Sequence, residues 1–503
     1  MKLRTYGIGA LLLGLLSGCG TAGYLSFTPE KRYAPAQLLA DLQVAEQTLR
    51  TNHPSLYWYA TPDSVAAAFE RARRLCNDSM TELQFRNLLN ETVAVLRCGH
   101  TSVRHSHQYN RYYAGPMQQV LRQQLFPLQL KVLDDSTLII TGNANRRDTV
   151  LQPGMQVTAI NNRTSKQLID TFRSLIPLDG YAVTFAYQNI SNNFPRFYHS
   201  RFPNDTLFTI EYRDFEGRPQ TALRTTGRRM AAATGRSTPD VPPFVRPQMD
   251  TTRTVREQQR IRQFQIDTAH QLATLRLNTF NNALRRGYLR RTFRQLRQQQ
   301  IPNLVLDVRS NPGGLIQSSL LLTRLIKNEP FRFTDSMFAV RRTVRTQARV
   351  SRHFITNVGM RVLNKKINDS LYNFRFFSGR TYRPHRLHYN GQVWVLTGGY
   401  SFSATTMFLA NVKGQPNVTL VGEETGGGYY GNNGGFIPDV TLPNTRLRMR
   451  LPLYRIVINS RIPQKGTGVP PDVWVAPTAE SIRQNRDVKT EKVLELIRQR
   501  RQG

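Results

Sequence analysis

Three segments in the C-terminal half repeat one pattern, and this repeat constrains the fold more than any other feature of the sequence. Each begins with a run of apolar residues and continues into a glycine-rich turn: IPNLVLDVRSNPGG from Ile301, GQVWVLTGGYSFSA from Gly391 and VTLVGEETGGGYYG from Val418. Helix-like sequences follow the first two turns. Strands that alternate with helices form largely parallel sheets with helices on their faces. The repeat therefore predicts an α/β core, to which we assign residues 269–480.

The three glycine-rich turns are where chemistry is expected. Ligands of such sheets bind beyond the carboxyl ends of the strands, and glycine lets backbone N–H groups approach a substrate closely. That is the arrangement needed for an oxyanion hole. Ser403 stands at the start of a predicted helix, where the helix N-terminus favours developing negative charge, whereas Ser401 is interpreted as a capping or packing residue. A serine at such a turn is a nucleophile or only a helix cap, and the turn alone does not decide.

The rest of the chain divides by periodicity and composition. A helical N-terminal domain is predicted from apolar residues spaced three and four apart, and a β-rich domain from alternating apolar and polar residues around turn signals. The predicted segments are residues 1–19 (signal and lipidation site), 36–105 (helical domain), 126–220 (β-rich domain), 221–268 (linker or excursion) and 481–503 (C-terminal helix or tail).

The first residues predict export. Lys2 and Arg4 precede a short apolar run, Ile8–Leu16, which is too short for a comfortable membrane span and fits a secretory signal. The run ends in Leu-Ser-Gly-Cys, which resembles a bacterial lipoprotein signal, so Cys19 would carry the lipid and hold the protein on a membrane. We expect a lipid-anchored protein whose remaining chain lies in the periplasm or at the cell surface. The alternative is a signal anchor that is never cut.

Two further cysteines, Cys76 and Cys98, could pair in an oxidising compartment or stay reduced. They are too few for a metal cluster, and no cofactor or metal site is predicted. The net charge of +36 invites a nucleic-acid partner. However, the arginines are spread along the chain, and the densest patch, from Arg285, carries apolar residues at helical spacing. We therefore expect no nucleic acid, and attraction to anionic lipid headgroups instead.

Several motifs in order resemble one family. The loops Leu306–Gly314, Ser401–Ala404 and Val421–Gly428 are similar to the signature loops of the tail-specific, or C-terminal processing, serine peptidases, which include the tricorn core protease. The motif Cys98-Gly99-His100-Thr101 and the Pro-Gly turn at 153–154 fit the family's layout. The resemblance implies a crotonase-like α/β catalytic core with a helical N-terminal domain and a PDZ-like β-rich domain.

The resemblance assigns the nucleophile and its surroundings. Ser403 matches the nucleophile, and the oxyanion would be held by backbone N–H groups of Gly313 or Gly314 and of Ala404. Many members place a lysine base in the third loop, but Gly428 occupies that position here. The lysine branch is therefore excluded, or the protein is inactive.

The tricorn-like branch instead takes a histidine from the helical segment as base, and His100 stands at that place. An imidazole has a suitable pKa for this role near neutrality. His105 and His107 are nearby but lie outside the motif.

A third group normally orients the imidazole, and its identity stays open. The tricorn-like branch supplies a glutamate near the segment matching residues 464–472, but Lys465 falls near that place. Glu423, Glu424 or no carboxylate at all are the alternatives.

The sequence thus predicts a membrane-anchored serine endopeptidase that hydrolyses peptide bonds through an acyl-enzyme on Ser403, with His100 as general base. Its partners would be a peptide or protein substrate and, through the lipid, a membrane. The alternative is a catalytically inactive peptide-binding lipoprotein of the same fold.

Overall fold

The structure is a computed structural model that describes residues 27–114, 116–133, 135–226, 260–281, 284 and 286–502. The predicted lipidation site, Cys19, lies outside these residues. Within the described part of the chain, every helix is too short or too polar to traverse a bilayer.

A six-stranded sheet forms the centre of the C-terminal half. Its order is β10-β11-β12-β19-β20-β25, and every neighbouring pair is parallel except β10 and β11. The central strands are buried on both faces, as their continuous apolar runs predict. The strands are β10 (Arg262–Asp267), β11 (Leu272–Leu277), β12 (Asn303–Asp307), β19 (Gln392–Thr397), β20 (Val418–Gly422) and β25 (Val473–Trp474).

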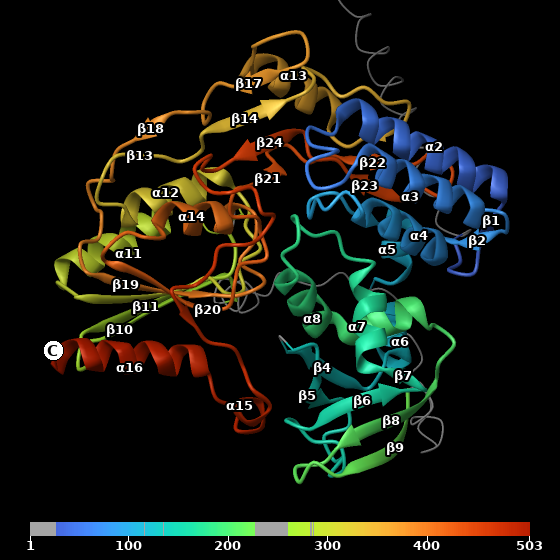
Figure 1. Cartoon of the computed structure of the whole chain (residues 1–503), viewed down its shortest axis with the longest axis horizontal. Coiled ribbons are helices and arrows are strands. Elements are labelled where there is room, and N and C mark those ends of the chain that lie inside the picture. Colours follow the sequence, from blue (N-terminus) through green and yellow to red (C-terminus); the bar gives the residue numbers. More distant parts are fainter. Residues whose placement is uncertain are drawn as a thin grey trace, which may run out of the picture.

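Helices cover both faces of this sheet (Figure 1). One face packs on α11 (Arg286–Gln298), α12 (Ile316–Ile326) and α14 (Ala404–Val412). The other packs on α16 (Val488–Gln502), which follows the short α15 (Ala479–Arg483). In α11 the buried side chains are Leu289, Thr292, Phe293 and Leu296, so the arginines of this helix face outward as its amphipathic pattern predicts.

Two smaller antiparallel sheets adjoin the core at the top of Figure 1. Their strand orders are β16-β17-β14-β24-β21 and β15-β22-β23-β3, and β13 pairs with β18. Helix α13 (His353–Leu363) follows β15 directly. The strands are β13 (Phe331–Arg332), β14 (Ser336–Ala339), β15 (Arg349–Val350), β16 (Asn364–Lys366), β17 (Tyr372–Phe374), β18 (Thr381–Tyr382), β21 (Gly431–Gly434), β22 (Asp439–Thr441), β23 (Arg448–Arg450) and β24 (Tyr454–Val457).

The N-terminal part is helical and is joined to the core by a strand. Thr61 and Thr81 cap α3 and α4 with their side chains, which helps to fix where these helices begin. Strand β3 pairs with β23 of the C-terminal half. The elements are β1 (Arg32–Tyr33), α2 (Pro35–Asn52), α3 (Pro62–Leu75), β2 (Met80–Thr81), α4 (Glu82–Ala94), β3 (Val103–Arg104), α5 (His107–Tyr112) and α6 (Pro116–Gln124).

A third unit, between these two in sequence, is an antiparallel sheet with its own hydrophobic core. Its order is β4-β5-β6-β8-β9, with β7 on β6, and α7 and α8 pack against it (Figure 1). The elements are β4 (Leu128–Val132), β5 (Leu138–Asn143), β6 (Gln156–Ile160), β7 (Arg163–Thr164), α7 (Ser165–Arg173), α8 (Thr184–Arg201), β8 (Leu207–Arg213) and β9 (Pro219–Thr225).

Two details differ from the predicted segments or decide between alternatives. The range 221–268, expected to be a linker or excursion, begins and ends in strands, β9 and β10; residues 227–259 lie outside the described part. Strand β10 was missed because it is a half-exposed edge strand with only Phe264 and Ile266 as apolar residues. Cys76 and Cys98 are buried free thiols.

Candidate active site

Ser403 lies at the start of α14, where the chain leaves β19 at the carboxyl edge of the central sheet. Its backbone has φ 55° and ψ −120°, a sparsely populated conformation for a residue with a side chain. Such strain persists only where the surroundings over-determine the backbone, and it gathers at functional sites. Here two glycines press on the serine: a methyl group on Gly313 would lie 2.9 Å from Ser403 Cβ, and one on Gly427 3.0 Å from Ser403 N. The glycine-rich loops therefore hold the hydroxyl in place by close backbone contact.

His100 reaches this hydroxyl from the helical N-terminal part. Its Nε2 lies 2.9 Å from Ser403 Oγ, within hydrogen-bond distance. The imidazole is 4% exposed and packs against the ring of Phe402 at 5.0 Å between centroids. Pairing of β3 with β23 fixes the chain three residues after His100 to the core, which explains how a distant segment is brought to the serine.

The other side of the imidazole faces Asp179, in the loop between α7 and α8. His100 Nδ1 and Asp179 Oδ1 are 3.9 Å apart, and both side chains are buried. Among the described residues, neither Nδ1 of His100 nor Oδ2 of Asp179 has a hydrogen-bond partner. A shift of about 1 Å would bring the Nδ1–H of His100 within hydrogen-bond distance of Oδ1 of this carboxylate. Asp179 is thus the nearest candidate for the orienting acid, which the sequence left open.

The Asp179 carboxylate accepts a hydrogen bond from Gly99 N, at 2.8 Å from Oδ1, and the N–H of Gly428 also acts to lower its pKa. Gly99 precedes His100 in sequence, and Gly428 stands where other members of the resembled family carry a lysine. The segment 464–472, where a glutamate was sought, lies beside this loop, since Tyr181 N donates to Gly466 O. The candidate acid, Asp179, therefore comes from the loop between α7 and α8, which lies beside the segment in which the glutamate was sought.

Burial shifts the pKa values of Asp179 and His100 in opposite directions. Loss of water raises the pKa of Asp179 to about 7, against the effect of the two N–H donors. Burial, and in smaller part the positive charge of Arg450, lowers the pKa of His100 to about 3. His100 is therefore neutral near pH 7 and able to accept a proton from Ser403. Ionisation of Asp179 in the same range favours the imidazolium that this transfer forms.

The predicted oxyanion donors are present, with one change. The N–H of Gly313 donates to Asn311 Oδ1 at 2.9 Å, so it is already engaged. The N–H groups of Gly314 and Ala404 donate to no other group in the described part of the chain. These two are the donors available to a developing oxyanion beside Ser403.

The other residues weighed from the sequence are engaged elsewhere. Ser401 Oγ donates to Val308 O and accepts from Gly398 N, so it supports the loop. His105 contacts Glu82. Glu423 pairs with Lys489 at 2.6 Å, which ties α16 to the sheet edge, and Glu424 accepts from Gly468 N. Neither glutamate is shown in contact with His100.

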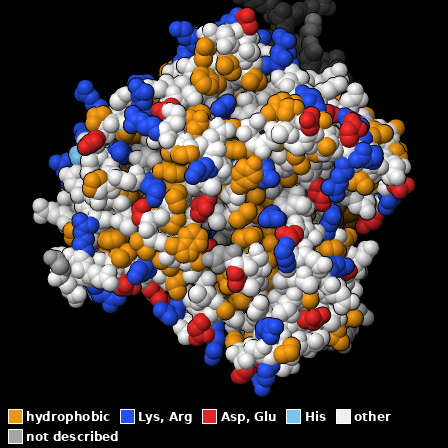
Figure 2. All heavy atoms as spheres, in the orientation of Figure 1, with side chains coloured by type: hydrophobic (Ala, Val, Ile, Leu, Met, Phe, Trp, Pro, Cys, Tyr) orange, Lys and Arg blue, Asp and Glu red, His pale blue; other side chains and the backbone are white. Residues whose placement is uncertain are grey.

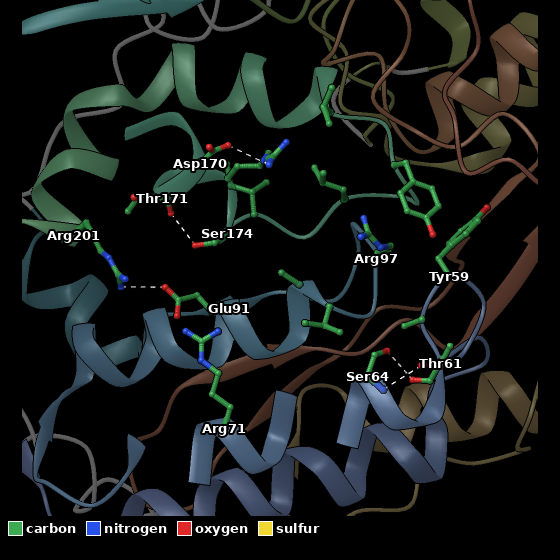
Figure 3. Close-up of a pocket in the computed structure, with 18 residues that line it drawn as sticks. Tyr59, Thr61, Ser64, Arg71, Glu91, Arg97, Asp170, Thr171, Ser174 and Arg201 are labelled. Atoms are coloured by element: carbon green, nitrogen blue, oxygen red, sulfur yellow. Dashed lines mark hydrogen bonds and ion pairs between the residues drawn. The ribbon is translucent and has the colours of Figure 1, made fainter. Parts of the chain in front are cut away.

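A separate cleft of roughly 1000 Å³ lies between α3, α4 and the α7 end of the β-rich unit (Figure 3). The Arg97 guanidinium stacks over the ring of Tyr181 at 4.2 Å at one end of it, and Arg201 pairs with Glu91 at the other. Neither His100 nor Ser403 lines this cleft. It touches the site only through sequence neighbours, because Arg97 O accepts from Gly180 N, next to Asp179.

A buried histidine hydrogen-bonded to a strained serine, at a helix N-terminus beside free backbone N–H groups, defines a serine-type hydrolase site. Sequence reasoning placed Ser403 and His100 but missed Asp179. The sequence around Asp179, Leu178-Asp179-Gly180, contains no recognisable motif. Only the tertiary proximity of Gly99 and Gly428 distinguishes Asp179 from the other aspartates of the chain.

Comparisons with known proteins agree with this class. Residues 271–475 match the model of peptidase family S41. Mature CPAF in complex with lactacystin superimposes with a TM-score of 0.63 at 13% identity, over 92% of this chain and 98% of that one. The photosystem II D1 C-terminal processing protease gives 0.40 at 13% identity, over 88% and 94% of the two chains. The tricorn protease gives 0.37 at 12%, over 92% and 37%. No curated protein matches the chain.

At these identities the solved structures show a common fold alone, and only CPAF exceeds a TM-score of 0.5. The family match covers the five parallel strands of the central sheet, β11 to β25, and all three glycine-rich loops. The match of residues 271–475 supports the resemblance to the tail-specific, or C-terminal processing, serine peptidases that the motifs indicated. The fold of the chain is a multidomain protease fold.

Proposed function

We propose that this chain is a serine endopeptidase that uses Ser403 as nucleophile and His100 as general base. The observation that carries the proposal is the 2.9 Å contact between His100 Nε2 and Ser403 Oγ at the strained start of α14. This is the tricorn-like solution to the missing lysine at position 428. The assignment is consistent with family S41 membership, which the fold and the glycine-rich loops support.

The chemistry follows from the geometry. His100 Nε2 takes the proton as Ser403 Oγ attacks the carbonyl carbon of the scissile peptide bond. The resulting oxyanion is stabilised by the N–H groups of Gly314 and Ala404. When the C–N bond breaks, His100 gives the proton to the leaving amine, and the acyl group stays on Ser403. Water, deprotonated by His100, then hydrolyses the ester and releases the new carboxyl terminus.

Asp179 acts through His100 and is a positioning residue. A contact between its carboxylate and the Nδ1–H would select the tautomer that leaves Nε2 free to accept the serine proton. The 3.9 Å separation closes to a hydrogen bond when substrate binds, in this proposal, since apo catalytic contacts are often long. A fixed backbone cradle at Gly99 and Gly428 keeps the carboxylate on the correct side of the ring.

The domain roles are part of the same proposal. The central sheet with its helices would be a crotonase-like core, and the β4–β9 unit a PDZ-like domain that docks an extended peptide by strand addition. The Pro153-Gly154 turn and the adjoining strands β5 and β6 support this role. Deleting the unit should then weaken cleavage of long peptides more than hydrolysis of a small ester.

The cellular location of the enzyme is part of the proposal as well. A lipid on Cys19 would hold the peptidase at a bacterial membrane, with the body in the periplasm or at the cell surface. Intact mass spectrometry of membrane-purified protein tests this. A mature chain that begins at another residue, or carries no lipid on Cys19, would overturn it.

A catalytically inactive, peptide-binding lipoprotein is the second candidate, and the unclosed His100–Asp179 distance favours it. A fluorophosphonate probe separates the two, because it phosphonylates only an activated serine. We expect labelling of the folded wild type at Ser403, mapped by peptide mass, and none of Ser403→Ala or His100→Ala. Ser401→Ala serves as the matched control and should label normally. A folded wild type that never labels, and cleaves no peptide, would support the inactive alternative.

A further inference from the structure

Helix α13 presents apolar side chains to the outside. Phe354, Ile355, Val358 and Val362 are 79%, 68%, 42% and 62% exposed, whereas Thr356 and Met360 are its buried residues. The exposed four follow the spacing i, i+1, i+4 and i+8, which places them on one stripe of the helix. Helix α13 thus turns a phenylalanine and three aliphatic side chains outward, and this stripe has no packing partner among the described residues.

The patch extends beyond the helix. Ile367 and Phe376, on the chain that follows α13, are also more than half exposed. Figure 2 shows hydrophobic side chains gathered at the upper edge of the molecule, where Figure 1 places α13, with Lys and Arg side chains on both sides. We call the six residues the α13 face: Phe354, Ile355, Val358, Val362, Ile367 and Phe376.

The charge of the segment that carries the α13 face is predominantly positive. Residues 341–386 contain twelve Lys or Arg and a single acid, Asp369, which pairs with Lys366. Arg352, Arg361 and Arg375 are exposed, and no carboxylate within the described chain pairs with them. This local excess is far above the average of the chain, so the general basic composition does not account for it.

A basic cleft adjoins the same face. It encloses roughly 450 Å³ and is lined by Phe376 of the α13 face, by other aromatic rings, and by Arg286, Arg290, Arg324 and Arg380. None of its lining residues is acidic. Guanidinium groups are weakly hydrated and form bidentate contacts with phosphate oxygens. The cleft therefore suits an anionic group held beside an apolar surface.

We propose that the α13 face is a docking surface for an anionic lipid bilayer. The apolar stripe would enter the interface between headgroups and acyl chains, and the surrounding arginines would contact lipid phosphates. The peptidase body would then rest on the membrane in a fixed orientation instead of swinging on its tether. A tether at this membrane requires the proposed lipid anchor, whereas the apolar and basic surface is independent of it.

The root of the tether lies on an element that adjoins the same four-stranded sheet as α13. Phe27, the first described residue, packs on Tyr109 and Tyr112 of α5 at 6.1 and 5.8 Å between ring centroids. Seven residues lie between it and Cys19, and the eight steps along the chain span at most about 28 Å. Helix α5 follows β3 and α13 follows β15. These two edge strands of one four-stranded sheet lie about 15 Å apart and run in opposite directions, so the two helices leave the sheet at opposite ends.

Other occupants fit the α13 face less well. A second copy would bring two strongly basic surfaces together, which like-charge repulsion opposes. Nucleic acid would use the arginines but leave the aliphatic stripe in water. An anionic bilayer satisfies both features at once.

Vesicle flotation tests the proposal with the unlipidated chain 20–503, which keeps every described residue. We expect binding to vesicles of phosphatidylcholine with about a third phosphatidylglycerol, weaker binding as salt rises, and little binding to pure phosphatidylcholine. Peptide hydrolysis by the same preparation is measured in parallel. Vesicle binding without hydrolysis would leave the docking surface standing and contradict only the proposed function.

Two pairs of variants with matched controls locate the surface. Ile355→Ser with Val362→Ser should lower the partition coefficient on anionic vesicles about tenfold or more. The control is Leu207→Ser with Leu223→Ser, which changes aliphatic residues of the β-rich unit that are 45% and 60% exposed and should have little effect. Arg352→Gln with Arg361→Gln should weaken binding about tenfold at low salt, and Arg146→Gln with Arg147→Gln much less.

Three results would overturn the proposal. The first is no binding to anionic vesicles. The second is an equal loss in the α13 variants and in their controls. The third is a dimer in sedimentation experiments that Ile355→Ser with Val362→Ser dissolves, since the stripe would then belong to a second copy.

Discussion

The two halves of the catalytic site are built by different means. Ser403 depends on its local chain: β19 ends, two glycine loops press on its backbone, and α14 begins. His100 and Asp179 come from the helical and β-rich parts, and only long-range contacts such as β3 with β23 bring them to the serine. The position of Ser403 is therefore set by the chain around it, whereas the positions of His100 and Asp179 depend on how the three parts of the molecule pack together.

The largest expected effect tests whether the two halves act as one unit. Ser403→Ala and His100→Ala should each lower kcat by a factor on the order of 10⁵ to 10⁶, and the double variant should lose little more. Steady-state hydrolysis of a peptide substrate measures this. If His100→Ala retains near-native turnover while Ser403→Ala does not, the base lies elsewhere and the tricorn-like assignment is wrong.

The second prediction concerns Asp179, in the part of the site that is assembled from different domains, and uses the variant Asp179→Asn. The amide keeps the size and the backbone contacts but cannot stabilise the imidazolium, so kcat should fall about 10² to 10⁴-fold.

The thermal stability of the Asp179→Asn variant should rise, although its activity falls. The raised pKa of Asp179 means that its ionisation costs folding free energy as the pH rises through 7. The variant should therefore melt about 2–4 °C higher than wild type at pH 8, and the difference should shrink as the pH falls towards 4. Wild-type activity, or a lower melting temperature at pH 8, would argue against a buried positioning acid.

A smaller effect on kcat is expected from Gly313, in the part of the site that the chain around Ser403 sets. Gly313 has φ 94°, and a methyl group there would lie 2.8 Å from Phe402 O and 2.9 Å from Ala404 N. Gly313→Ala should displace the oxyanion donors and lower kcat about 10²-fold, with a smaller change in KM. Gly217→Ala, at a positive-φ turn with open space around it, is the control for backbone strain alone. Equal activity of both variants would separate the Gly313 contact from catalysis.

The smallest catalytic effect is expected at Ser401. Its hydroxyl joins Gly398 N and Val308 O, so Ser401→Ala should keep kcat within about tenfold but lower the free energy of unfolding by roughly 1–3 kcal/mol. Denaturant unfolding and peptide hydrolysis on the same sample measure both. A loss of activity comparable to that of Ser403→Ala would reverse the roles of the two serines.

The same contrast explains what the sequence could predict. Apolar runs, glycine turns and amphipathic spacing are local signals, and they indicated the α/β core, the helix faces and Ser403. His100 was found only because it stands in a motif of the resembled family. Asp179 has no local signal, since its role arises from N–H groups of Gly99 and Gly428, distant in sequence. Strand β10 was missed for a related reason: edge strands bury few apolar residues.

The measurement that tests the central claim most directly is the pH dependence of kcat/KM in wild type and in Asp179→Asn. Burial keeps His100 neutral well below pH 7, so the rising limb belongs to ionisation of Asp179, whose pKa is raised to about 7. We predict that wild-type kcat/KM rises with a midpoint near 7, and that the variant shows a low, flat profile from pH 5 to 8. An unchanged midpoint in the variant, or a folded wild type without hydrolysis at any pH, would contradict the Ser403–His100–Asp179 site.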